Sequence, residues 1–272
     1  MRKIEDFVYA RPRSIQEISQ HLNKNWRTVD RYVNEIILEY GTLDKRIFRE
    51  GTRGALKIIY WAAIEKVGHS VFQEELETKI FAGQGKRDFS AFDIFQHVDD
   101  KNKRAIIEKR IDENSTNLEE FKEILMKAKK KVVIFSGNVS FANLRNKNFD
   151  MMKIFEELIV RKVKIEIVAK VDLTGKENIE KVLALNYRHG VEAIEIRHRE
   201  QPLRAVIVDD KVLRIKEVKE PTGKINELDK KIYIFYTIKD KEWASWMTRI
   251  FRKMFSSSIG SKKRLEELGK IL

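Results

Sequence analysis

Four polar side chains repeat along one face of a predicted helix, and their types suit contacts with nucleic acid. The helix is expected over about residues 26–40, because apolar residues recur there at helical spacing. The outward-facing residues near its N-terminus are Arg27, Thr28, Arg31 and Asn34. Guanidinium, hydroxyl and amide groups bind phosphates and base edges of DNA, and a helix N-terminus itself attracts phosphate. This helix is therefore expected to read duplex DNA.

A predicted β-hairpin follows this helix and adds basic side chains. Strands are expected over residues 45–49 and 55–61, joined by a turn over residues 50–54 that contains two glycines. The hairpin carries Arg49, Arg53 and Lys57. We expect these three side chains to contact the sugar-phosphate backbone of DNA.

Shorter elements before the helix are expected to hold it in place. Ile4, Phe7 and Val8 have the spacing of a short amphipathic helix, and Ser14 with Glu17 forms a capping box that opens a second helix. A polar turn over residues 23–25 then leads into the third helix, which is the helix-turn-helix arrangement. Residues 1–61 resemble the winged helix-turn-helix of archaeal and bacterial regulators, through Trp26-Arg27-Thr28-Val29 and Tyr32-Val33. Winged helices also serve as protein-interaction modules, and that alternative stays open.

The composition favours a polyanionic partner and excludes several kinds of site. The 272 residues include 55 Lys and Arg and 42 Asp and Glu, which gives a net charge of +13. The absence of cysteine excludes disulfides, thiol chemistry and Cys-based zinc sites. Five scattered histidines predict no metal site and no cofactor. The charged N-terminus and the short apolar runs predict no membrane association and a cytoplasmic, nucleoid-associated protein.

The middle of the chain, residues 62–114, is expected to be a helical linker. It contains a helical stripe of apolar residues and the closely spaced Phe89, Phe92 and Phe95. These apolar side chains are more than a lone surface helix needs, and they have two interpretations. They form either ordinary core between two domains or the interface of a homodimer, since helix-turn-helix proteins generally read two half-sites as dimers.

Residues 115–272 alternate between predicted helices and strands. This pattern predicts an α/β sandwich with a largely parallel sheet. The expected strands are 132–135, 163–169, 191–196, 205–208, 211–215 and 232–237, and the expected helices include 149–160 and 176–189. The whole chain is thus expected to be multidomain, combining α+β and α/β parts.

The C-terminal part resembles one phospholipase D-like half-domain. The likeness is carried by residues 132–137, 163–168 and 202–213. That superfamily has His-x-Lys-x4-Asp before an Asp-Asp-Lys-Val-type turn, and the resemblance implies a histidine that attacks phosphorus and a lysine that holds the phosphate. Aligned on Asp209, this chain has Pro202 at the histidine position and Arg204 at the lysine position.

This degenerate motif predicts that the domain is not an enzyme and has no catalytic residue. Proline supplies no nucleophile, and His198 is out of register and expected to be a surface residue. Arg204 keeps a positive charge and can bind a small anionic effector. Packing and assembly are the roles that we expect of this domain first.

The order of the parts is similar to that of the archaeal TrmB-like transcription regulators. The resemblance implies a homodimeric regulator that binds double-stranded DNA, with a C-terminal domain, residues 115–272, that has lost catalysis. Two alternatives remain. One is an architectural chromatin-type protein that coats DNA, which the basic surplus of the C-terminal part favours. The other is a phospholipase D-superfamily nuclease, which Pro202 disfavours.

Overall fold

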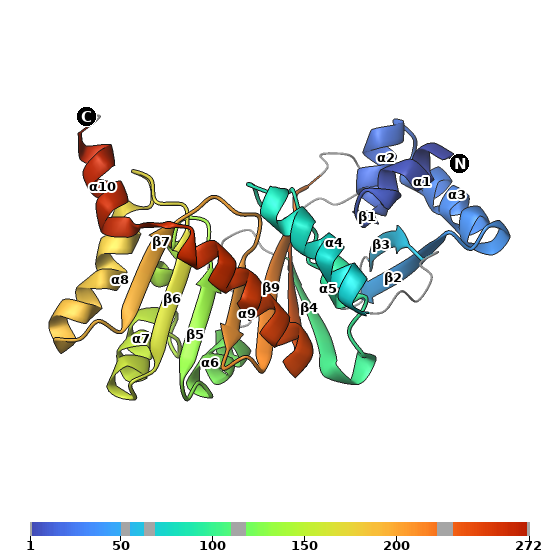
Figure 1. Ribbon diagram of the computed structural model, residues 1–272. Helices are drawn as coiled ribbons and strands as arrows, with labels where there is room; N and C mark the ends of the chain where they lie inside the picture. Colours follow the sequence, from blue (N-terminus) through green and yellow to red (C-terminus); the bar gives the residue numbers. More distant parts are fainter. Residues whose placement is uncertain (1, 50–54, 63–68, 110–117, 222–230, 271–272) are drawn as a thin grey trace.

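The computed structural model describes residues 2–49, 55–62, 69–109, 118–221 and 231–270. Within these ranges the chain is a mixed α/β protein with ten α-helices, a three-stranded sheet and an eight-stranded sheet. The N-terminal elements lie at one end of the molecule and the C-terminal helix at the other (Figure 1). Within these same ranges, no helix is both long and apolar enough to cross a lipid bilayer.

The N-terminal elements form three helices and a small antiparallel sheet with strand order β1-β3-β2 in the described residues. In chain order they are α1 (Arg2–Tyr9), β1 (Arg13–Ser14), α2 (Ile15–Leu22), α3 (Trp26–Glu39), β2 (Leu43–Arg49) and β3 (Ala55–Trp61). The three helices and the hairpin strands expected from the sequence are present. The turn over residues 50–54, which includes Arg53, lies outside the described residues.

Local hydrogen bonds explain why the chain turns where it does between α2 and α3. The Ser14 side chain accepts the backbone N–H of Glu17, and the Glu17 carboxylate accepts the Ser14 backbone N–H at 2.7 Å. Asn23 ends α2 with a φ of 50°, in the left-handed region that asparagine tolerates. Asn25 then caps α3 by accepting the backbone N–H of Arg27 at 2.8 Å. These caps fix the three-residue turn that the sequence predicted.

The larger sheet has the strand order β11-β7-β6-β5-β8-β9-β10-β4 in the described part of the chain. Its strands are β4 (Lys103–Lys109), β5 (Lys131–Phe135), β6 (Lys164–Ala169), β7 (Ile194–His198), β8 (Ala205–Val208), β9 (Val212–Lys219), β10 (Ile232–Ile238) and β11 (Ile259–Gly260). The pairs β5–β6 and β6–β7 are parallel, whereas every other neighbouring pair is antiparallel. The expectation of a largely parallel sheet is therefore wrong. The connection from β8 to β9 is a tight turn, which returns the chain in the opposite direction.

Helices cover both faces of this sheet. The side chains of β5 are apolar on both faces, so each face has to be buried. Val132 and Ile134 face one core, and Val133 and Phe135 face another. The first core lies under α6 (Leu118–Met126), α7 (Met151–Val160), α8 (Lys176–His189) and the short η2 (Ser140–Asn143). The second lies under α4 (His69–Ala82), α5 (Phe92–Phe95) and α9 (Lys241–Ser256). The chain ends its described part with α10 (Ser261–Gly269).

The segment 62–114 is not wholly helical. After α5 and the short η1 (Asp100–Asn102), residues 103–109 form β4, which pairs antiparallel with β10 along its whole length. The expectation of a helical linker is wrong for these residues. The pairing spans more than a hundred residues of sequence, and no local pattern in a seven-residue segment reveals it.

The aromatic cluster of this segment is core within the chain. Phe92 and Phe95 are 0% and 1% exposed, and Phe89 is also buried. The Phe92 ring lies 6.3 Å from Phe48 on β2 and 6.4 Å from Tyr236 on β10, measured between ring centroids. Of the two interpretations of the cluster, core between the N-terminal unit and the large sheet is the one that the structure supports. Because these rings are buried within one chain, they no longer argue for a dimer interface in this segment.

Candidate functional site

The outer face of α3 carries two exposed arginines. Arg27 and Arg31 are one turn apart, both are exposed, and α3 lies at the far end of the N-terminal unit from the large sheet (Figure 1). The Arg31 guanidinium is 3.7 Å from the Glu35 carboxylate, and its side chain is 67% exposed. An exposed pair of this kind contributes little stability, so Arg31 can exchange Glu35 for a phosphate at small cost. Thr28, between them in sequence, is half-buried.

Two other expected contact residues are engaged within the chain. The Lys57 ammonium lies 2.6 Å from the Asp30 carboxylate, and both side chains are largely buried. The Asn34 side-chain oxygen accepts a hydrogen bond from Lys45. Arg49 ends β2, and Arg53 lies outside the described residues. Seven side chains were expected to contact DNA. Among those whose side chains the structure describes, Arg27 and Arg31 are the exposed ones.

A polar network links the N-terminal helices to the large sheet. The Lys219 ammonium on β9 lies 3.1 Å from both the Glu17 and the Glu217 carboxylates, and Ser90 donates to Glu217 at 3.1 Å. Burial lowers the pKa of Lys219, but the two carboxylates outweigh it and the net shift is upward. Burial raises the pKa of Glu17, and Lys219 and Ser14 outweigh it to lower the pKa. Glu17 thus caps α2 and also holds that helix to β9.

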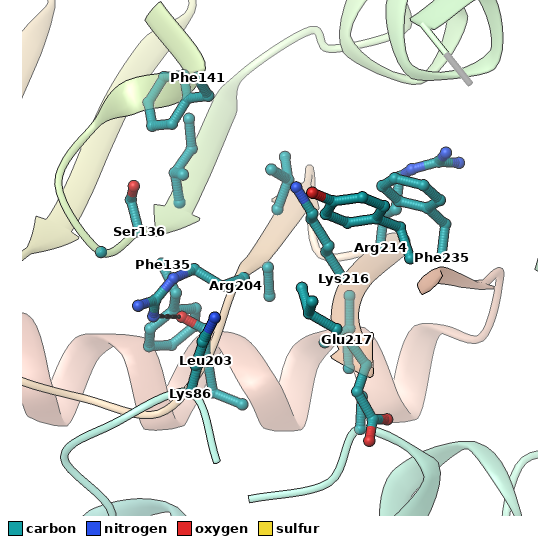
Figure 2. Close-up of a pocket in the computed structure, with 18 of the residues that line it drawn as sticks. Lys86, Phe135, Ser136, Phe141, Leu203, Arg204, Arg214, Lys216, Glu217 and Phe235 are labelled. Atoms are coloured by element: carbon teal, nitrogen blue, oxygen red, sulfur yellow. Dashed lines mark hydrogen bonds between the residues drawn. The ribbon is translucent and has the colours of Figure 1, made fainter. Parts of the chain in front are cut away.

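A cavity of about 260 Å³ lies at the carboxyl end of β5, beside Arg204 (Figure 2). At this edge of the sheet, the carboxyl ends of the parallel strands β5 and β6 meet the start of the antiparallel strand β8. The sequence pointed to Arg204 alone as an anion-binding residue, because the rest of the lining comes from segments distant in sequence.

Hydrogen bonding between neighbouring strands places Ser136, Arg204, Lys216 and Phe235 side by side across the sheet. The Lys216 backbone N–H donates to the Arg204 carbonyl at 2.7 Å, and Lys216 pairs with Phe235 on β10. Phe135 pairs with Ala205, so Ser136 follows beside Arg204 on the other side. In Figure 2, Arg204 and Ser136 lie across the cavity from Lys216 and Phe235.

Two residues that sequence reasoning missed hold Arg204 in place. The buried Gln201 amide donates to the Ser136 carbonyl at 2.9 Å and accepts the Leu203 N–H at 2.6 Å, which joins the loop after β5 to the loop before β8. A Cβ atom at Gly137 would lie 2.7 Å from an Arg204 guanidinium nitrogen. The guanidinium therefore packs against the backbone at Gly137, and a side chain there would displace it. Gly137 ends the segment 132–137 that carries the phospholipase D-like resemblance, but its contact with Arg204 was not predicted, and no motif marks Gln201.

Of the three aligned motif residues, Pro202 and Arg204 both border the cavity, whereas Asp209 does not. Pro202 is buried and packs against Gly83, where an added Cβ would lie 2.8 Å from the proline ring. Asp209 lies at the other end of β8, in the turn to β9, and its carboxylate accepts the backbone N–H groups of residues 129, 130 and 131 at 2.7–2.9 Å. Burial raises the pKa of Asp209, but these three donors outweigh it and lower the pKa. Asp209 therefore fixes the start of β5.

His198 is a half-buried residue and not a surface side chain, which corrects the expectation. Its Nδ1 atom accepts the Val171 backbone N–H at 2.9 Å. Burial lowers the pKa of His198, and the nearby Arg264 adds to this. The ring is held by the loop after β6. Among the residues that the structure describes, no group of three or more His, Asp or Glu is placed to hold a metal ion.

Comparisons with known proteins give structural similarities at low identity. No family model matches the chain, and no curated protein matches it. Nuc, a phospholipase D family member from Salmonella typhimurium, is 12% identical, with a TM-score of 0.40 over 58% of this chain and 97% of its own. NucT from Helicobacter pylori is 13% identical, with a TM-score of 0.41 over 58% and 99%.

A third solved structure covers more of the chain. TrmBL2, an archaeal chromatin protein with a novel mode of DNA binding, is 12% identical, with a TM-score of 0.40 over 91% of this chain and 88% of its own. At identities and TM-scores this low, function has to be argued from the residues of this chain.

Proposed function

We propose that this protein binds duplex DNA through the outer face of α3, as the reading helix of a winged helix-turn-helix unit over residues 1–61. The observation that carries the proposal is the pair Arg27 and Arg31, exposed one turn apart on the helix that follows a capped three-residue turn. The two guanidinium groups, the N-terminus of α3 and the net charge of +13 all favour a polyphosphate partner.

The proposal is tested by measuring binding of a fluorescent 30-base-pair duplex by anisotropy across a range of salt concentrations. Replacing both Arg27 and Arg31 by alanine is expected to weaken binding. If both contact phosphates, the slope of log affinity against log salt becomes shallower by about 2. If either reads a base edge, the loss is about 2–6 kcal/mol on the preferred sequence and smaller on others.

The matched control is the double change Lys262→Ala and Lys263→Ala in α10, which removes the same charge at the opposite end of the molecule (Figure 1). This variant is expected to keep most of the affinity. If the two double variants lose affinity equally, binding comes from net charge and α3 is not the reading helix.

A specific regulator and a DNA-coating protein remain the two forms of this proposal. Transcription regulation by a homodimer is the leading one, since such proteins read two half-sites. The alternative, a chromatin-type coating protein, is favoured by the hydrogen bond from Lys45 to Asn34, which leaves fewer free side chains on α3 to read bases. A nuclease footprint separates them: a short palindrome supports the regulator, and uniform protection supports coating.

We further propose that residues 115–272 act without catalysis, and that the cavity beside Arg204 holds a small anionic effector. Pro202 supplies no nucleophile, and the nearest histidine of the motif region, His198, is hydrogen-bonded to Val171. The nuclease alternative is therefore disfavoured by these residues.

A further inference from the structure

We propose that the cavity beside Arg204 binds a small aromatic anion: a flat apolar ring that carries one phosphate, sulfonate or carboxylate group. The inference deepens the effector site proposed above and is independent of DNA binding by α3. It rests on the partners of Arg204, on the lining of the cavity and on the cavity's size.

Arg204 borders this cavity and has no carboxylate partner among the described residues. Its Nη1 atom donates to the Leu203 carbonyl at 2.7 Å and to the Gln201 carbonyl at 3.5 Å, and no acidic group of the described chain pairs with the guanidinium. Burial alone lowers its pKa, which reflects a charge removed from water without a counterion. A half-buried charge of this kind is stabilised when an anion binds it.

Three other cations at the cavity have carboxylate partners. Arg214 pairs with Glu120 at 2.7 Å, Lys86 pairs with Glu220 at 2.8 Å, and Lys231 lies 3.8 Å from Glu220. The Lys216 ammonium lies over the Tyr233 ring, 4.5 Å from its centroid. The three ion pairs neutralise part of the basic lining, whereas the charge of Arg204 has no such pair within the described chain. Glu217 also borders the cavity, but its carboxylate is turned away, toward Ser90 and Lys219 (Figure 2).

The rest of the lining is apolar and rich in aromatic rings. Phe121, Phe141, Tyr233 and Phe235 border the cavity together with aliphatic side chains. A ligand with only an anionic group, such as inorganic phosphate, leaves these rings without a partner. An aromatic ring on the anion fills that space and stacks on them. The volume, about 260 Å³, is just below the range of roughly 300–1,000 Å³ that is typical of ligand pockets, so the ring is small.

The test uses phenyl phosphate as the probe and the full chain as the protein, with binding measured by isothermal titration calorimetry. Phenyl phosphate is expected to bind at least tenfold more tightly than either inorganic phosphate or neutral benzyl alcohol. Replacing Arg204 by methionine is expected to weaken phenyl phosphate binding about 10- to 100-fold, because one charge-assisted hydrogen-bonded contact is lost. The same change is expected to leave benzyl alcohol binding unaltered.

The matched control is Arg188→Ala, which removes an exposed arginine of α8 that pairs with Glu156 and does not border the cavity. Its affinity for phenyl phosphate is expected to stay within twofold. Gly137→Ala gives a second variant that keeps the charge of Arg204 but displaces its guanidinium, and it is expected to weaken phenyl phosphate binding at least fivefold. This variant keeps the proposal testable if Arg204→Met fails to fold.

Several outcomes overturn the proposal. They are no binding of phenyl phosphate, equal binding of inorganic phosphate, or equal losses in the Arg204 and Arg188 variants. Displacement of phenyl phosphate by duplex DNA also overturns it, since Arg204 is then part of a nucleic-acid surface. Failure of DNA binding by α3 is detected separately, by the Arg27 and Arg31 variant, and leaves the result for the cavity unaffected.

Discussion

Replacing Lys219 by methionine is expected to destabilise the protein strongly at neutral pH. Lys219 is buried and lies 3.1 Å from the Glu17 and Glu217 carboxylates. At an effective dielectric constant of about 20, each pair gains roughly 5 kcal/mol of Coulomb attraction before desolvation is subtracted. Methionine fills most of the volume but takes the ammonium group away from the buried Glu217 carboxylate and the half-buried Glu17 carboxylate. Removing one partner of a buried pair costs about 3–5 kcal/mol, and we expect a loss of that size.

The pH dependence distinguishes this mechanism from simple loss of packing. In the wild-type protein the pKa of Glu17 is lowered, so its stabilising contribution is present above the unfolded value of about 4.3 and is lost as the pH falls through the folded pKa. Without Lys219, only the Ser14 hydrogen bonds oppose the effect of burial, so the pKa of Glu17 is higher in the variant than in the wild type. The variant is then expected to regain stability relative to the wild type as the pH falls from 7 to 5.

The measurement is urea unfolding of both proteins at pH 7 and pH 5, followed by tryptophan fluorescence. Lys262→Met, at an exposed position of α10, serves as control and is expected to change stability by less than about 0.5 kcal/mol. The triple change Glu17→Gln, Lys219→Met and Glu217→Gln is expected to restore most of the loss. A Lys219 variant with the same deficit at both pH values would refute the reasoning, because the deficit would then come from packing.

Two further predictions concern a buried acid and the absence of catalysis. Burial raises the pKa of Asp93 to about 7, so the stability of the wild-type protein is expected to fall as the pH rises from about 4 to 7. The change Asp93→Asn is expected to remove this pH dependence and to stabilise the protein by roughly 2–4 kcal/mol at pH 8. Thermal unfolding of both proteins at pH 4 and pH 8 measures the effect. Purified protein incubated with plasmid, oligonucleotides and a chromogenic phosphodiester, with and without divalent metal, is expected to show no turnover; turnover that copurifies with the protein and disappears in a His198→Ala variant would contradict a non-catalytic domain.

Local interactions made much of the N-terminal unit predictable from the sequence. The Ser14–Glu17 capping box, the turn over residues 23–25 and the apolar periodicity of α3 all act within four residues of sequence. The helix at 176–189 and the strands at 55–61 and 205–208 also have the bounds that their patterns predict. Such elements are readable because the residue types that start, stop and face a helix or strand are adjacent along the chain.

The tertiary structure decided which residues are available for function. Lys57 is bound to Asp30, Glu17 is shared between the cap of α2 and Lys219, and Phe92 is enclosed between the hairpin and β10. The position of Arg204 depends on Gln201 and on the closeness of Gly137, which no pattern in the sequence marks. These contacts join segments separated by up to 202 residues, as in the Glu17–Lys219 pair. Residue type and local spacing specify what a side chain can bind, but its partner is set by which distant strands and helices pack together, because burial and charge pairing act through space and not along the chain.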